Sequence, residues 1–179
     1  MQEIKTFGID ASLTGTGVAY LIDKKLQRVS LLASKKIGVQ RVVDIEDKLK
    51  HHIDACPAGL ILIEGYAYAA ANQAHQIGEL GGVIRRMLHR RNVNWIEVAP
   101  SQLKKFATGK GNCKKDLVLL NVFKKWGVEF QTNDEADAFV LAMIGQALLG
   151  IDIGYGAQYQ SEVISELLKK YKEVLPQCS

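Results

Sequence analysis

The chain has 179 residues, of which 47% are hydrophobic, so it can bury one substantial core but is short for two ordinary domains. Its net charge of +4 permits a nucleic-acid partner without requiring one, and its three cysteines lack the spacing of a zinc site or a disulfide framework. With no signal-peptide layout and no apolar run near the roughly 20 residues of a membrane span, we expect a soluble, cytoplasmic protein with no membrane partner.

The N-terminal segment has the pattern of three β-strands. Ile4–Ile9 and Gly17–Ile22 are joined by the turn-forming residues SLTGT, which predicts a hairpin. Leu26–Ile37 alternates more loosely and predicts a third strand, in which Lys35 and Lys36 suit an exposed sheet edge. We therefore expect this part of the chain to form one side of a sheet.

The middle of the chain alternates between helical and strand patterns. Val42–Ala55 has apolar residues at a helical period, and the continuous apolar run Leu60–Ile63 predicts a strand buried on both faces. Gln73–Arg91 has a helical period again, and Asn94–Val98 predicts a fifth strand. Two further helices are expected, near 101–107 and 113–126.

The last third of the sequence is helical. Thr132 and Glu135 form a capping box before an apolar stretch, which predicts a helix that ends near Gly150. Residues 160–175 have the pattern of an amphipathic appended helix. This order predicts an α/β domain over residues 1–150, with a five-stranded mixed sheet covered by helices on both faces, and a C-terminal tail over residues 151–179.

Four acidic residues occupy positions that suit a site. Asp10 and Glu64 each end an expected strand, although either alone is more often a solvated strand end. Asp134 and Asp137 are three residues apart and so lie on one face of the last long helix. A favourable interaction with the helix dipole explains Asp134, but Asp137 continues into an apolar face, where a carboxylate needs a compensating charge.

A divalent metal would supply that charge. Carboxylates that converge raise one another's pKa values, whereas Mg²⁺ or Mn²⁺ takes oxygen ligands of this kind. Two such ions can activate a water molecule and stabilise the leaving oxygen of a phosphodiester. The acids therefore predict a phosphodiester-cleaving site with two bound ions.

The motifs GIDASLTGTGVA, ILIEGY and DEADA resemble those of the RuvC family of Holliday junction resolvases, over about residues 4–150. The resemblance implies a ribonuclease H-like fold and the activity of a crossover junction endodeoxyribonuclease in DNA recombination and repair. It implies symmetric nicking of two opposed strands, with 5′-phosphate and 3′-hydroxyl ends. The implied metal-binding catalytic acids are Asp10, Glu64, Asp134 and Asp137.

A basic segment between the acids, VAPSQLKKFATGKGNCKKDLV, also resembles the family, in which one lysine precedes a GxG loop and another follows it. The resemblance assigns these two lysine positions, and with them contact to the DNA backbone, to Lys104 and Lys115. Residues 100–128 contain seven lysines and one acid, a concentration that predicts a phosphate-contacting face, although such lysines can also simply solubilise a helix surface. The further lysines expected on this face are Lys105, Lys110 and Lys114.

The resemblance extends to base contacts and assembly. Family members have an aromatic residue after the second acid that is thought to push between bases. Both Tyr66 and Tyr68 are candidates, with Tyr68 preferred, unless their rings simply pack. The segment 73–91, with glycines at 78, 81 and 82, resembles the one through which the family forms two-fold dimers. A homodimer on four-way or other branched DNA could cut two opposed strands. No motif indicates whether branch-migration machinery takes part.

Three alternatives remain open from the sequence. The first is another nuclease of this fold, such as a ribonuclease H or a general debranching enzyme. The second is an actin-like ATP-binding fragment, because DASLTGTG resembles a phosphate loop, although such proteins need a second lobe. The third is a noncatalytic junction-binding protein. Ala11-Ser12, where the family often has a proline-glycine turn, suits a phage-type or otherwise atypical member.

Overall fold

The structure is a computed structural model that describes residues 3–66, 74–154 and 156–175; the side chains of residues 74–77 and 115 are also outside the described part. The elements, in chain order, are β1 (Lys5–Asp10), β2 (Thr16–Ile22), β3 (Lys25–Leu32), α1 (Gly38–Ala55), β4 (Leu60–Glu64), α2 (Ala74–Arg90), β5 (Trp95–Val98), α3 (Pro100–Thr108), α4 (Lys115–Trp126), α5 (Asn133–Leu148) and α6 (Gln158–Lys170). Among the described residues, no helix is both long and apolar enough to cross a membrane.

In the described part of the chain, the strands form one five-stranded mixed sheet in the order β3-β2-β1-β4-β5. The first three strands are antiparallel neighbours, which confirms the expected hairpin, and the pairs β1/β4 and β4/β5 are parallel. The central pair β1/β4 has Thr6 opposite Leu60 and Ile9 opposite Ile63. The carboxyl ends of β1 and β4 therefore meet at the same edge of the sheet.

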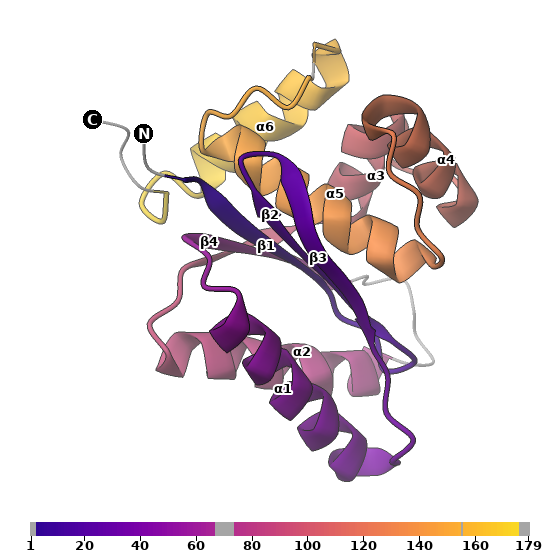
Figure 1. Cartoon of the computed structure of the whole chain (residues 1–179), viewed down its shortest axis with the longest axis vertical. Helices are drawn as coiled ribbons and strands as arrows, with labels where there is room; N and C mark the ends of the chain where they lie inside the picture. The colour runs from indigo at the N-terminus through magenta and orange to yellow at the C-terminus, as the bar shows by residue number, and fades with distance from the viewer. Residues whose placement is uncertain (1–2, 67–73, 155, 176–179) are drawn as a thin grey trace.

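Helices cover both faces of the sheet, as Figure 1 shows. On one face, α1 and α2 pack against Phe7 and Ile9 of β1 and Ile61 of β4. On the other, α3, α4, α5 and α6 surround a core that contains Leu60 and Leu62 of β4. Because side chains alternate along a strand, neighbouring residues of β1 and β4 pack into different cores. This arrangement confirms the α/β architecture expected from the sequence.

Three expected boundaries were wrong. The third strand ends at Leu32 instead of Ile37, because Leu32 lies opposite Thr16, where β2 begins, and β2 offers no further residue for pairing. Lys36 therefore lies in the connection to α1, where it forms an ion pair with Asp44 at 3.3 Å. Helix α1 begins at Gly38 instead of residue 42, because its first turn is solvent-exposed and so lacks the apolar period.

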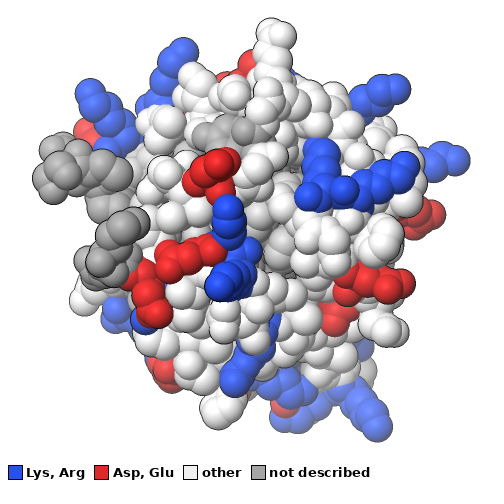
Figure 2. All heavy atoms as spheres, turned by 45° about the horizontal axis from the view of Figure 1, so that its top comes forward, with Lys and Arg blue, Asp and Glu red and all other residues white. Residues whose placement is uncertain are grey.

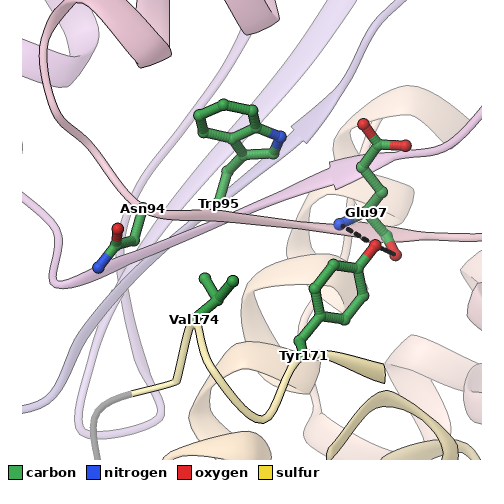
Figure 3. Close-up of a pocket in the computed structure, with 5 residues that line it drawn as sticks. All are labelled: Asn94, Trp95, Glu97, Tyr171 and Val174. Carbon is green, nitrogen blue, oxygen red and sulfur yellow. Dashed lines mark hydrogen bonds between the residues drawn. The ribbon is translucent and has the colours of Figure 1, made fainter. Parts of the chain in front are cut away.

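The third wrong boundary is the end of α6, which lies at Lys170 instead of residue 175. Tyr171 leaves the helix, and its hydroxyl accepts a hydrogen bond from the backbone N–H of Glu97 (3.2 Å) and lies 3.1 Å from the Glu97 carbonyl oxygen (Figure 3). This hydroxyl pairs with backbone groups at the outer edge of β5, which would otherwise be open to another strand. Val163 and Leu167 of α6 are buried in the same core as α3 and α5.

Buried polar side chains link β1 to α5. Gln146 is fully buried, and its amide nitrogen donates to the carbonyl of Ile4 (2.9 Å) and to the hydroxyl of Thr6 (3.0 Å). The Thr6 hydroxyl donates to the carbonyl of Ala142 (2.9 Å), and the Gln146 amide oxygen accepts from the backbone of Lys24 (3.1 Å). These bonds fix α5 in position along β1.

We expect the Gln146→Leu variant to lose about 1 to 3 kcal/mol of unfolding free energy, because the amide of this buried side chain would no longer bond to the buried Thr6 hydroxyl or to the backbone of Ile4 and Lys24. Urea denaturation measures the loss. Gln131→Leu, which changes an exposed glutamine just before α5, is the control and should change stability by less than about 0.5 kcal/mol. Equal stability of the two variants would contradict this role for Gln146.

Candidate active site

Asp10 and Glu64 lie side by side at the ends of neighbouring parallel strands. In β1, Phe7 and Ile9 face α1 and α2, so Asp10 faces the opposite side of the sheet. The same alternation in β4 directs Glu64 to the side of Leu62, which lies in the α5 core. Asp10 is only 4% exposed, whereas Glu64 is half-buried. Both carboxyl groups therefore lie on the face that α5 covers.

The first turns of α5 bring the other two acids to this face. Thr132 caps the helix: its hydroxyl accepts from the backbone N–H of Glu135 (3.2 Å), and the Glu135 carboxylate accepts from the backbone N–H of Thr132 (3.0 Å), which confirms the expected capping box. The cap thus occupies the carboxylate of Glu135. Asp134 is half-buried, and Asp137 is only 5% exposed.

Glycines in β1 and β2 allow α5 to lie directly on the strands. A Cβ atom added at Gly8 would lie 1.9 Å from the carbonyl oxygen of Ala138, and one added at Gly17 would lie 2.0 Å from that of Asp134. Gly17 is also the cross-strand partner of Asp10. The sequence analysis assigned these glycines no role. The available signal was that Gly8 and Gly17 occupy strand positions at which the alternation of side chains predicts an apolar side chain in the core.

Electrostatics show that the four carboxyl groups interact. Burial raises the pKa of Asp10 well above its usual range, and the charge of Glu64 and a hydrogen bond shared with it raise the pKa further. The charges of Asp137 and Asp134 act in the same direction. All four acids predicted from the sequence thus contribute to one electrostatic environment around Asp10.

The donor set fits a hard divalent cation by its chemistry, because carboxylate oxygens surround a buried acid whose ionised form is disfavoured. A cation would favour that ionised form. As the side chains stand, the described residues contain no group of three or more His, Cys, Asp or Glu that could hold a metal ion. Metal binding by these acids would therefore require their side chains to adjust.

The predicted lysines have different environments. Lys104 is half-buried on α3, and Lys110 and Lys114 are exposed in the connection between α3 and α4. Lys105 instead forms an ion pair with Glu162 of α6 at 2.8 Å. Figure 2 shows the molecule with the end formed by α3, α4 and α6 turned forward, and basic and acidic side chains lie next to one another on this face. The surface is thus less uniformly basic than its lysine count indicated.

Lys115 is the first residue of α4, and its side chain is outside the described residues. Its predicted contact with the DNA backbone therefore stays a prediction.

Tyr66 and Tyr68 also differ. The guanidinium of Arg85 lies 4.2 Å from the centre of the Tyr66 ring and donates to the carboxylate of Glu97. A Cβ atom at Gly81 would lie 2.8 Å from the Tyr66 ring, so this glycine leaves room for the stacked pair. Tyr66 is therefore held by packing beside Glu64, whereas Tyr68 lies outside the described residues.

Comparison with known proteins gives consistent matches. The family described as "Crossover junction endodeoxyribonuclease RuvC" matches residues 6–145. A protein of that description from Rickettsia typhi is 30% identical over 145 residues, which cover 75% of this chain and 92% of the relative. One from Prochlorococcus marinus is 26% identical over 147 residues, which cover 77% of this chain and 95% of the relative.

Solved structures show a similar fold. Thermus thermophilus RuvC superposes with a TM-score of 0.67 at 19% sequence identity, and the match covers 83% of this chain and 98% of that one. The yeast mitochondrial Holliday junction resolvase has a TM-score of 0.57 at 13% identity, with 95% of this chain and 84% of that one covered. These likenesses confirm the expected ribonuclease H-like fold.

Proposed function

This chain belongs to the family of the crossover junction endodeoxyribonuclease RuvC, and from this we propose that it is a metal-dependent endonuclease that resolves Holliday junctions. The observation that carries the proposal is the environment of Asp10, a buried carboxyl group whose pKa is raised by its burial and by three other acids. A cluster of this kind has no favourable role in a simple binding protein, because it destabilises the fold unless a cation compensates it.

The four acids are proposed as the metal-binding catalytic residues. Asp10, Glu64 and Asp137 would be the principal ligands, and Asp134 would complete the site. We propose two ions per site, Mg²⁺ or Mn²⁺, which when bound would supply activation of the attacking water and stabilisation of the leaving oxygen. Asp10, at the end of β1, and Asp137, on α5, are the two most buried of these acids.

The protein binds branched DNA, and its four-way form is the proposed principal substrate. A relative of the same fold, Thermus thermophilus RuvC, has been solved in complex with Holliday junction substrate. In this chain, Lys104 and Lys115 are proposed to hold the DNA backbone near the acids, with Lys110 and Lys114 beside them. Tyr68 and Tyr66, which follow Glu64 closely in the sequence, are the proposed candidates for contact with a base, and Tyr66 would have to leave its stacked position on Arg85 to make that contact.

We propose that a homodimer performs the paired incisions, because one site can cut only one strand at a time. Helix α2 is the proposed interface. Cβ atoms added at Gly78 and Gly82 would meet no described atom within 4 Å, so both glycines are open to the backbone of a second chain. We also propose that the protein acts in the cytoplasm.

The proposal predicts that the purified protein nicks a synthetic mobile four-way junction only when Mg²⁺ or Mn²⁺ is present. The expected products are symmetric nicks in two opposed strands, with 5′-phosphate and 3′-hydroxyl ends that a ligase can seal. Denaturing electrophoresis of end-labelled strands, with and without EDTA, measures this.

Matched substrates separate the alternatives. A three-way junction, a linear duplex of the same sequence and an RNA–DNA hybrid should be cut more slowly than the four-way junction. Preferential cleavage of the hybrid would indicate a ribonuclease H instead, and cleavage that persists in EDTA would contradict the role of the acids. Binding without cleavage under every metal condition would indicate a noncatalytic junction-binding protein.

A further inference from the structure

Helix α6 lies outside the residues that match the family, and its Tyr159 ring lies against Gly109, at the start of the segment that carries the exposed lysines. We call residues 109–114, between α3 and α4, the basic turn; it contains Lys110 and Lys114. On its inner side, the Thr108 hydroxyl donates to the carbonyl of Lys104 (2.9 Å) and accepts from the backbone N–H of Lys110 (3.2 Å). The start of the turn is thus fixed to the last turn of α3.

Tyr159 of α6 holds the turn from the other side. Its ring lies against Gly109, where an added Cβ atom would be 3.4 Å from the nearest ring carbon. Gly109 has a φ of +85°, a left-handed conformation that ends α3 and sets the direction of the turn. The half-buried Tyr159 ring therefore covers the residue at which the chain changes direction.

A lysine connects the three helices at this point. The ammonium group of Lys125, in α4, donates to the Tyr159 hydroxyl (2.8 Å) and to the carbonyl of Ala107 (2.6 Å). The second bond satisfies a carbonyl in the last turn of α3. On the opposite side of the turn, a Cβ atom at Gly111 would lie 3.0 Å from the carbonyl oxygen of Ser101. The basic turn thus contacts the α6 tyrosine at Gly109 and α3 at Gly111, while its lysines stay exposed.

We propose that Tyr159 is a positioning residue that holds the basic turn in the orientation in which Lys110 and Lys114 meet the phosphates of branched DNA. The inference rests on the proposed function, since it assigns a role to α6 in the same DNA-binding surface. Lysine side chains are flexible, so a fixed backbone beneath them reduces the ordering cost of each phosphate contact. A loosened turn would still be basic, but its lysines would contact the backbone less often.

The test is the salt dependence of junction binding, measured by fluorescence anisotropy on a labelled four-way junction in EDTA. Tyr159→Leu removes both the ring contact with Gly109 and the hydroxyl; Tyr159→Phe removes only the hydroxyl. For the Leu variant we expect binding about fivefold to tenfold weaker and a slope of log K against log salt smaller by roughly one, which corresponds to one lost phosphate contact. For the Phe variant we expect about a twofold loss.

Tyr171→Phe is the matched control, because it removes a hydroxyl that bonds to β5, and it should keep the wild-type slope. A purely structural role for Tyr159 would lower the unfolding midpoint and leave the slope unchanged. A folded Tyr159→Leu variant with wild-type junction affinity and salt slope would overturn the inference. If that variant does not fold, a Tyr159→Phe variant with wild-type affinity and slope would overturn it. The wild-type protein is measured first for junction binding and nicking, so a failure of the proposed function is recognised separately.

Discussion

The Asp10→Asn variant is expected to nick a four-way junction at least about a thousandfold more slowly than the wild-type protein, in Mg²⁺ or in Mn²⁺. Asparagine has nearly the same shape, so the fold should be unchanged. It lacks the negative charge at the most buried point of the acid cluster, where Asp10 interacts with Glu64, Asp134 and Asp137. Junction binding in EDTA should remain within about threefold of wild type, because the proposed phosphate contacts come from lysines.

Glu135→Gln is the control for this experiment. It makes the same carboxylate-to-amide change on α5, next to Asp134, and a glutamine at this position still completes the capping box with Thr132. Its nicking rate should equal that of the wild-type protein within about twofold. If Asp10→Asn nicked at the wild-type rate, the assignment of the active site would be wrong.

The Asp10→Asn variant should be more stable than the wild-type protein when no metal is present. Since the folded-state pKa of Asp10 lies above its ordinary value of about 3.9, ionisation at neutral pH destabilises the folded state. The penalty is fully present above the folded pKa and disappears as the pH falls through the ordinary value. The unfolding midpoint of Asp10→Asn in EDTA should therefore exceed that of wild type at pH 7, by a margin that shrinks toward pH 4.

The second large effect is expected for Gly17→Ala. The new methyl group would lie 2.0 Å from the backbone carbonyl oxygen of Asp134, a contact that a side-chain rotation cannot relieve. The N-terminal turns of α5 must then move away from β2, and Asp134 and Asp137 move with them. We expect a loss of roughly 3 kcal/mol or more of unfolding free energy, and nicking at least about a hundredfold slower in the protein that remains folded.

Gly156→Ala is the matched control, because an added Cβ atom there would meet no described atom within 4 Å. Its stability should lie within about 0.5 kcal/mol of wild type. Guanidinium denaturation followed by circular dichroism measures the unfolding free energy of both variants. A Gly17→Ala protein as stable and as active as the control would show that α5 does not need this close approach to the sheet.

Much of the fold could be predicted because its signals are local. Local patterns of apolar, turn-forming and capping residues identified the helices and strands of the described residues by type, and the largest boundary errors occurred where such patterns do not depend on the partner element. The strand pattern extends to Ile37, but β3 ends at Leu32, opposite Thr16, the first residue of β2. The helical pattern extends to residue 175, but α6 ends at Lys170, and the hydroxyl of Tyr171 bonds to Glu97. Strand length depends on the partner strand, which a local pattern does not contain.

The sequence by itself determined the order of the elements and predicted which four acids come together, because strand ends and helical spacing are properties of neighbouring residues. Only the tertiary structure decided that Gly17 supports Asp134, that Glu162 pairs with Lys105 and that Tyr159 covers Gly109. Each of these contacts joins residues far apart in the chain. Their meeting depends on how helices lie on the sheet and on each other, which is set by the packing of the whole core.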